Sequence, residues 1–222
     1  MQVEIRGITK RYKKQAVLQG VDLVAQGGRC IGILGSNGSG KSTFLSILAG
    51  VLPRDSGTFS CDGKELFADP AARARYVGYV PQGTPLIEEL SARDNLLLWY
   101  DKPTMERELR SGVLHMLGVD EFLKVTVSKM SGGMKKRLSI GCAMAKRPPI
   151  LLLDEPTAAL DLACKAQIAE YLRRYKAAGG LLLLTTHDTP ELDLCDEIYI
   201  LKNGVLVPFE YDGDVEKLVK SL

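Results

Sequence analysis

The chain of 222 residues lacks a long apolar stretch. Its apolar runs, such as Leu181–Leu184, are the length of a strand, whereas a helix that spans a bilayer needs about 20 apolar residues. The N-terminal residues MQVEIRGITKRY also lack the apolar core of a secretory signal. We therefore expect no membrane-spanning segment, so that any role at a membrane would require docking to a separate partner.

An excess of charge of one sign is also missing. The chain carries 29 Lys and Arg against 27 Asp and Glu, which gives a formal net charge of +2. Proteins that bind nucleic acid usually show a strong basic excess, because they neutralise phosphates. We therefore expect no nucleic acid among the partners.

The cysteines are few and scattered. Five occur, and none forms a CxxC pair: Cys30, Cys61, Cys142, Cys164 and Cys195. This spacing argues against a zinc site and against a disulfide framework, and it favours reduced, mostly buried thiols in a cytosolic protein. With 45% hydrophobic and 25% charged residues, the chain can bury a sizeable core, and its length fits one domain with an inserted subdomain.

Short apolar runs alternate with longer helical stretches along most of the chain. This alternation is typical of an α/β fold with a mainly parallel sheet covered by helices on both faces. The expected strands are residues 30–34, 76–80, 150–153, 181–185 and 198–201, and the expected helices include residues 43–50 and 165–178. Asn203-Gly204 between apolar runs predicts a hairpin.

Two regions depart from the alternation. Residues 2–9 and 17–24 are strand-like with no helix between them, which predicts an N-terminal antiparallel β element. Residues from about 83 to 147 show helical periodicity and no convincing strand. We therefore predict a core of residues 1–82 and 148–222 with an inserted α-helical subdomain at about 83–147.

A phosphate-binding pattern follows the first buried strand. The segment GSNGSGKST matches G-x-x-x-x-G-K-[ST], in which glycines let backbone N–H groups point at phosphate oxygens and the next helix adds its positive N-terminal end. Lys41 would reach the β- and γ-phosphates, and the Ser42 hydroxyl would bind Mg²⁺. The pattern predicts a nucleoside triphosphate, although kinases and GTPases share it. The candidate nucleotide-binding residues are Gly35, Ser36, Asn37, Gly38, Ser39, Gly40, Lys41, Ser42 and Thr43.

An acidic pair ends the buried strand at residues 150–153. Asp154 and Glu155 come where ligands bind in open α/β sheets, at the carboxyl end of a strand. We expect Asp154 to hold Mg²⁺ and Glu155 to polarise the attacking water as general base. Acids at a strand end are common, but a phosphate loop needs such a partner.

The segment MSGGMKKRLSIGCAMA, residues 130–145, resembles the signature of the ABC ATPases, LSGGQ. Ser131 is a good helix N-cap, and Gly132 and Gly133 leave backbone N–H groups accessible. The resemblance implies a P-loop NTPase fold with a RecA-like core. It also implies that this segment contacts the γ-phosphate held by an opposite subunit, so that ATP joins a head-to-tail dimer with two composite sites.

Four further positions match the family one by one. Gln82 is similar to the family's glutamine-loop residue, which senses Mg²⁺ or the lytic water, and His187 is similar to its switch histidine, which contacts the γ-phosphate. Asp161 resembles the loop that crosses the dimer interface. Tyr12 lies where the family stacks an aromatic ring on adenine, although a Tyr on a strand is often only packed.

Two departures from the family pattern bear on function. Met134 replaces the last Gln of the signature, and SGGM followed by basic residues is similar to exporters of drugs, polysaccharides, lipids or ions. Ala158-Ala159 replaces the usual Ser-Gly or Ser-Ala, and a small residue still permits a close interface. We expect the basic triplet 135–137 to form a solvated helix face.

The resemblance therefore implies an ATP-hydrolysing subunit that powers transport, with export favoured, together with a second ATPase subunit and a membrane-spanning partner. It places the chain in the cytoplasm, at the inner face of the membrane. A soluble ABC ATPase, for example in iron–sulfur assembly, and a non-hydrolysing regulatory module remain alternatives. Glu155 and His187 argue against the second, and the signature segment argues against a phosphotransferase. Apolar residues in 85–100 could form core or a groove for a partner's helix.

Overall fold

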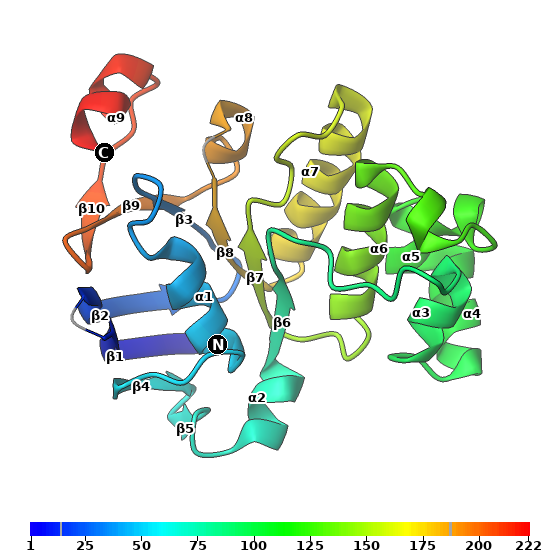
Figure 1. Cartoon of the computed structure of the whole chain (residues 1–222), viewed down its shortest axis with the longest axis horizontal. Helices are drawn as coiled ribbons and strands as arrows, with labels where there is room; N and C mark the ends of the chain where they lie inside the picture. The colour runs from blue at the N-terminus through cyan, green and yellow to red at the C-terminus, as the bar shows by residue number, and fades with distance from the viewer. Residues whose placement is uncertain (14, 187) are drawn as a thin grey trace.

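A six-stranded sheet forms the centre of the computed structural model, which describes residues 1–13, 15–186 and 188–222 (Figure 1). Its strands, in spatial order, are β10 (Val205–Phe209), β9 (Glu197–Lys202), β3 (Cys30–Leu34), β8 (Leu181–Thr185), β7 (Ile150–Asp154) and β6 (Val77–Val80). Neighbouring strands are parallel except for β10, which pairs antiparallel with β9. The hairpin predicted at Asn203-Gly204 is confirmed, and both residues have the positive φ angles of a tight hairpin turn, 52° and 76°.

A smaller antiparallel sheet comes from the N-terminal part of the chain. Its order is β2 (Gln15–Gln26), β1 (Gln2–Tyr12), β4 (Ser56–Cys61) and β5 (Lys64–Glu65). The β1–β2 pair confirms the predicted N-terminal element. The sequence did not predict β4 and β5, because only Phe59 and Cys61 of β4 are buried and the polar residues between them give a weak strand pattern.

Helices join and cover the strands of the central sheet. Those outside residues 83–147 are α1 (Lys41–Ala49), α2 (Pro70–Tyr76), α7 (Leu162–Ala177), α8 (Thr189–Leu192) and α9 (Val215–Ser221). Helix α2 corrects one prediction. Tyr76 was expected to begin a strand, but it ends α2, which Asp69 caps by accepting a hydrogen bond from the Ala72 N–H at 2.8 Å.

Residues 83–147 are helical, as the sequence predicts. They contain α3 (Ala92–Leu97), α4 (Lys102–Ser111), α5 (Val113–Met116) and α6 (Gly132–Ala143), with two short 3₁₀ turns. Gly112 separates α4 from α5, and the carboxylate of Glu108 occupies the space that a Cβ there would need. The division into a core and an inserted subdomain stays a prediction.

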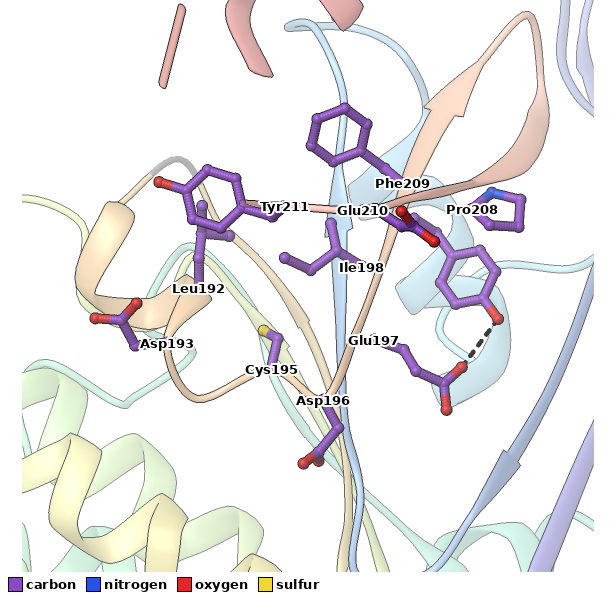
Figure 2. Close-up of a pocket in the computed structure, with 11 residues that line it drawn as sticks. Leu192, Asp193, Cys195, Asp196, Glu197, Ile198, Pro208, Phe209, Glu210 and Tyr211 are labelled. Atoms are coloured by element: carbon purple, nitrogen blue, oxygen red, sulfur yellow. Dashed lines mark hydrogen bonds between the residues drawn. The ribbon is translucent and has the colours of Figure 1, made fainter. Parts of the chain in front are cut away.

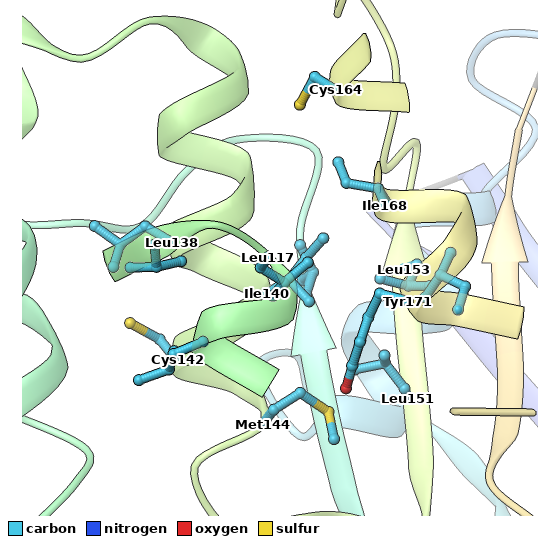
Figure 3. Close-up of a cluster of buried hydrophobic side chains, with 14 of the residues drawn as sticks. Leu117, Leu138, Ile140, Cys142, Met144, Leu151, Leu153, Cys164, Ile168 and Tyr171 are labelled. Atoms are coloured by element: carbon cyan, nitrogen blue, oxygen red, sulfur yellow. The ribbon is translucent and has the colours of Figure 1, made fainter. Parts of the chain in front are cut away.

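Alternate residues of the central strands face two different cores. In β7, Leu151 and Leu153 pack with α6 and α7 (Figure 3), whereas Ile150 and Leu152 pack with α1 and the small sheet. Successive side chains of a strand point to opposite faces of a sheet. Helix α1 and helix α6 therefore lie on opposite faces of the central sheet (Figure 1).

Within the described residues, no helix combines the length and the apolar character that crossing a membrane requires.

Candidate functional site

The phosphate-type loop connects β3 directly to α1. Gly40 precedes the helix with φ 106°, and a Cβ there would lie 2.8 Å from Cγ1 of Val17. Both the backbone conformation and the contact require glycine. The Ser39 N–H donates to the Ser36 carbonyl at 3.1 Å, and the Phe44 N–H donates to the Gly40 carbonyl at 2.8 Å. The loop is thereby held in a turn at the N-terminus of α1, with Ser36, Asn37 and Gly38 exposed.

Lys41 begins α1 and folds back over this loop. Its Nζ donates to the carbonyl oxygens of Gly35 at 2.7 Å and Ser36 at 3.2 Å, and the residue is only 6% exposed. Burial lowers the pKa of Lys41, and the negative charges of Glu155 and Asp154 oppose that shift. The ammonium group therefore lies between the loop and the acidic strand end. Ser42 is exposed and Thr43 half-buried in the same first turn.

The acidic pair follows the carboxyl end of β7, next to β8. Asp154 is buried and accepts a hydrogen bond from Oγ1 of Thr185 at 2.6 Å. The Glu155 N–H donates to the Thr185 carbonyl and to its Oγ1, both at 3.1 Å. Glu155 has a φ of 48°, which is uncommon for a residue other than glycine. Thr185 therefore positions both acids.

Gln82 follows β6 and reaches the same acidic pair. Its Nε2 donates to Oε2 of Glu155 at 2.9 Å. The structure thus brings Gln82, Glu155, Asp154 and Lys41 together at the carboxyl edge of the central sheet.

The basic triplet after the signature corrects a prediction. Lys136 is buried, at 4% exposed, and its Nζ donates to the carbonyls of Pro81 at 2.9 Å and Gln82 at 3.1 Å. Arg137 donates to the Leu117 carbonyl and to Oε1 of Gln167, both at 3.0 Å. The expectation of a solvated face was wrong, since Lys136 faces the core and links α6 to the residue that contacts Glu155.

The signature segment packs within the chain against the start of α7. Ser131 caps α6 by accepting a hydrogen bond from the Met134 N–H at 3.2 Å. A Cβ on Gly133 would lie 2.9 Å from Sγ of Cys164, whereas Gly132 is exposed and has more room. Because α6 and α1 lie on opposite faces of the sheet, the structure does not bring Ser131 to the phosphate loop of its own chain.

The remaining predicted residues lie at the margins of this region. Asp161 caps α7, its Oδ1 accepting from the Cys164 N–H at 2.8 Å, and Leu162 beside it is 85% exposed. Tyr12 ends β1 with 44% exposure, and Nζ of Lys10 lies 5.5 Å from the centre of its ring. His187 lies outside the described residues.

Two cavities adjoin the site. One of about 400 Å³ lies beside the phosphate loop, between β2 and the β9–β10 hairpin. The other, of about 300 Å³, is lined by Glu155, Ala158, Ala159, Lys165, Thr186, Asp188 and Glu191. In the second, Lys165 pairs with Asp188, and burial raises the pKa of Glu191. The acidic strand end therefore adjoins a polar cavity that includes a buried carboxyl group.

The sequence profile of the ABC transporter family matches residues 18–158. The chain belongs to the ABC transporter family. It is 33% identical over 210 residues to the linearmycin resistance ATP-binding protein LnrL of Bacillus subtilis (strain 168). It is 35% identical over 207 residues to the Nod factor export ATP-binding protein I of Sinorhizobium fredii (strain NBRC 101917 / NGR234). The matches cover 92% and 91% of the chain but only 68% and 60% of these ABC proteins.

Solved ABC structures agree with this assignment. The ATP binding subunit of an ABC transporter superposes with a TM-score of 0.83 at 28% identity, covering 100% of this chain and 93% of the other. A dimeric ATP-binding cassette in a post-hydrolysis state, bound to ADP and Pi, also has a TM-score of 0.83, at 27% identity, and covers 96% of this chain and 100% of its own. The fold is that of a P-loop NTPase of the ABC type, and the chain is an ATP-binding ATPase.

Sequence reasoning missed Lys136, Thr185 and Glu191 as parts of the site. Lys136 lies three residues after Gly133 and four before Ile140, so all three share one face of α6, and this spacing could have shown that Lys136 points inward. Thr185 and Glu191 have no such signal, because their roles depend on which strands and loops are neighbours in space.

Proposed function

We propose that the chain is the ATPase subunit of an exporter and works with a separate membrane-spanning partner. The observation that carries this proposal is the assembly of a phosphate loop, a buried acid and a glutamine-contacted glutamate at one sheet edge, in a chain whose relatives are named for export and for resistance. These names favour transport over iron–sulfur assembly. The chain spans 60% to 68% of those relatives, so the proposal extends to the ATPase part alone.

The nucleotide would bind with its phosphates over residues 35–43. The exposed N–H groups of the loop and the positive end of α1 favour anionic oxygens there. Lys41 would exchange its two loop carbonyls for phosphate oxygens, which offer its charge a stronger partner. Tyr12, exposed at the end of β1, would stack on the adenine ring.

The donor set fits Mg²⁺. The exposed Ser42 hydroxyl, the buried Asp154 carboxylate and the Gln82 amide all offer the hard oxygen ligands that Mg²⁺ prefers. No cluster of three His, Cys, Asp or Glu suited to a metal occurs among the described residues, in keeping with a metal held by few protein ligands and by phosphates. When bound, Mg²⁺ would neutralise charge on the phosphate oxygens.

The Glu155 carboxylate would act as the general base in ATP hydrolysis. Its strained backbone and the two Thr185 hydrogen bonds fix the start of the side chain, and Gln82 holds one carboxylate oxygen. The carboxylate would accept a proton from water as the water attacks the γ-phosphate. Lys41 would stabilise the negative charge on the transferring group, and His187 would contact the γ-phosphate. Positioning and electrostatics would therefore supply most of the rate.

A second chain would complete each site. Ser131 caps α6, which Gly132 and Gly133 begin, and this helix lies on the opposite face of the sheet from α1, so these residues would meet a phosphate loop across an interface between two chains. Similar cassettes are dimers. Ser131 and the N-terminus of α6 would contact the partner's γ-phosphate, and Asp161 with the exposed Leu162 would lie at the interface.

A groove between α1, β6 and α6 offers a place for the membrane partner. It has a volume of about 520 Å³, a mainly apolar lining and an exposed Trp99 at 59% exposure. Its wall reaches Tyr79 and Pro81, and Pro81 directly precedes Gln82. An apolar helix of a membrane-spanning partner would fit there, and its movement would displace Gln82, the residue that contacts Glu155. This would place the chain in the cytoplasm, at the inner face of the membrane.

Affinity capture from detergent-solubilised native membranes tests this proposal. Glu155→Gln bait with ATP should enrich a polytopic membrane protein, whereas Lys41→Ala bait should not, because its phosphate contacts are lost. Trp99→Ala should weaken capture, and Leu98→Ala is the matched control, since Leu98 is equally exposed at 58% but does not line the groove. Enrichment of iron–sulfur assembly proteins with no membrane protein would overturn the exporter and leave the ATPase.

A further inference from the structure

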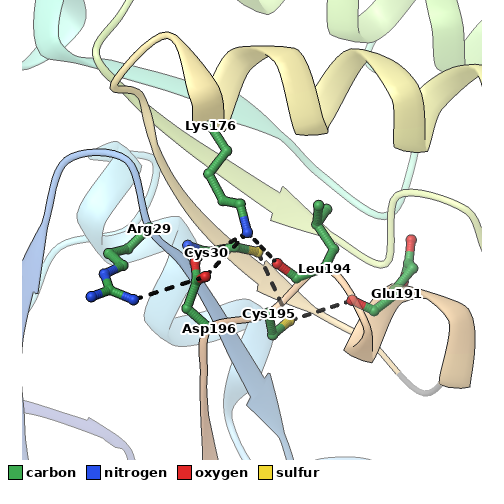
Figure 4. Close-up of polar contacts among 7 residues, drawn as sticks. All are labelled: Arg29, Cys30, Lys176, Glu191, Leu194, Cys195 and Asp196. Carbon is green, nitrogen blue, oxygen red and sulfur yellow. Dashed lines mark hydrogen bonds and ion pairs between the residues drawn. The ribbon is translucent and has the colours of Figure 1, made fainter.

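Two cysteines that are distant in sequence meet at the amino-terminal end of the central sheet. Cys30 begins β3, and Cys195 lies between α8 and β9 (Figure 4). Their Sγ atoms are 3.8 Å apart. A disulfide bond is about 2.05 Å long, so the two sulfurs would have to approach each other by about 1.8 Å. The sequence predicted scattered thiols and gave no sign of this pair.

Hydrogen bonds and an ion pair hold the segments that carry the two cysteines next to each other. The Cys30 N–H donates to Oδ2 of Asp196 at 2.7 Å, and the Asp196 N–H donates to the Cys30 carbonyl at 2.8 Å. Lys176 of α7 donates to the Leu194 carbonyl at 3.0 Å and pairs with Asp196 at 3.2 Å. The backbone on both sides of Cys195 is therefore fixed to β3 and α7 (Figure 4).

Only one of the two thiols can meet a reagent in solution. Cys30 is fully buried, at 0% exposed, whereas Cys195 is half-buried and lines a cavity of about 770 Å³ (Figure 2). The cavity lies between α8, β9 and β10, and its other lining residues include Tyr199 and Phe209. A small oxidant can therefore reach Cys195 first, and Cys30 lies buried next to it.

We propose that Cys30 and Cys195 form a redox-active pair that a hydroperoxide oxidises to an intramolecular disulfide, and that this disulfide slows ATP turnover. The inference rests on the ATPase activity and is independent of the membrane partner.

The chemistry proceeds in two balanced steps. The Cys195 thiolate attacks one peroxide oxygen, the O–O bond breaks, and the second oxygen leaves as water after taking a proton, which gives a sulfenic acid at Cys195. The Cys30 sulfur then attacks the Cys195 sulfur, the S–S bond forms as the S–O bond breaks, and hydroxide takes the Cys30 proton to leave as water. The two thiols lose two electrons in total, and the peroxide gains them.

The electrostatics agree with this order of attack. The hydrogen bond to Cys195, then burial, and then the charges of Cys195 and Asp196 raise the pKa of the Cys30 thiol, and the charge of Lys176 opposes this shift only in part. Cys30 therefore stays protonated until a sulfenic acid forms next to it. The Lys176 ammonium then stabilises the thiolate as it attacks.

The disulfide would act on catalysis through α8. Sγ of Cys195 donates to the Glu191 carbonyl at 3.4 Å, and forming the disulfide removes this S–H donor. Glu191 and Glu155 line the same cavity of about 300 Å³. Release of the Glu191 carbonyl and a pull on the segment after α8 would thus disturb the wall beside the proposed general base. The phosphate loop keeps its own hydrogen bonds, so ATP binding should change little.

Peptide mapping of the purified chain tests the pair directly. The chain is freed of reductant, treated with hydrogen peroxide, alkylated and digested without reduction. We expect a linked Cys30–Cys195 peptide and a fall in kcat of roughly tenfold, with an unchanged KM for ATP and recovery after dithiothreitol. Cys195→Ser should form no linked peptide and keep its turnover under peroxide, whereas the matched control Cys61→Ala, which removes another buried thiol, should behave as the unmodified chain does.

Two results would overturn the proposal. Oxidation of Cys195 to a sulfinic acid with no linked peptide would show that Cys30 cannot reach it. A fully formed disulfide with unchanged kcat would remove the coupling to catalysis. Both results come from the unsubstituted chain, so they do not depend on whether a cysteine variant folds.

Discussion

Replacement of Lys136 by methionine tests whether helix α6 supports Glu155, the proposed general base. Methionine keeps the length and apolar stem of lysine but removes both hydrogen bonds to the carbonyls of Pro81 and Gln82. A hydrogen bond to a charged group contributes about 1.5–3 kcal/mol, but the neutral side chain also avoids the cost of burying a charge. Burial lowers the pKa of Lys136, which shows that this cost is present.

The expected net loss of stability in Lys136→Met is about 2 kcal/mol, or a fall in Tm of roughly 4–8 °C for a chain of this length. Turnover should fall as well, because Gln82 would no longer be held where its amide contacts Glu155 at 2.9 Å. We expect kcat to fall about tenfold, equal to about 1.4 kcal/mol of barrier, with KM for ATP nearly unchanged.

Lys135→Met is the matched control for this prediction. Lys135 forms an ion pair with Oε1 of Glu88 at 3.4 Å, and such surface pairs contribute about 0–1 kcal/mol. It should keep wild-type kcat and Tm in the same phosphate-release and thermal-melting assays. A folded Lys136→Met protein with wild-type kcat would refute the reasoning, since the link from α6 to Gln82 would then be dispensable.

Two further substitutions probe the signature and the buried carboxyl group. Gly133→Val should cost about 1–3 kcal/mol of stability and so lower Tm, because a Cβ there already lies 2.9 Å from Sγ of Cys164. In Gly132→Val, the nearest atom to the new Cβ is 3.8 Å away, in Leu160. This variant should keep the wild-type Tm but lose ATP-dependent dimerisation. Equal melting of the two variants would contradict the packing argument. Burial raises the folded-state pKa of Glu191 above 4.5, so its stabilising contribution is full below pH 4.5 and is lost as pH rises through the folded pKa. The Tm of Glu191→Gln should therefore rise relative to that of wild type as pH increases from about 4.5 to neutrality. A Tm difference between the two proteins that does not change with pH would contradict this prediction.

Much of the fold could be predicted from the sequence, because most of its central strands are continuous apolar runs. Residues 30–34, 150–153 and 181–185 lie buried in the sheet, where such runs are typical. Strand β4 and helix α2 were missed, since β4 buries only alternate residues and α2 buries only Ala72. Their positions follow from packing against the rest of the chain.

The motifs of the candidate site could be named from the sequence, whereas the residues that hold them in place could not. Phosphate loops and signature segments are local in sequence, so residues 35–43 and 131–133 could be named directly. The contacts around the acidic pair are not local, since Gln82 meets Glu155 across 73 positions and Thr185 meets Asp154 across 31. The contact between Cys30 and Cys195, outside this site, spans 165 positions. Such contacts depend on the order of the strands in the sheet, which local sequence patterns do not predict.

The most direct test of the central claim compares ATP turnover and oligomeric state in wild type and Glu155→Gln, by phosphate release and sedimentation with Mg²⁺-ATP. Because Glu155 is proposed to accept the proton from water while other residues bind the phosphates, the variant should bind ATP, turn over at least about 100-fold more slowly, and accumulate as a dimer. Wild-type turnover in Glu155→Gln, with no ATP-dependent dimer, would contradict the account.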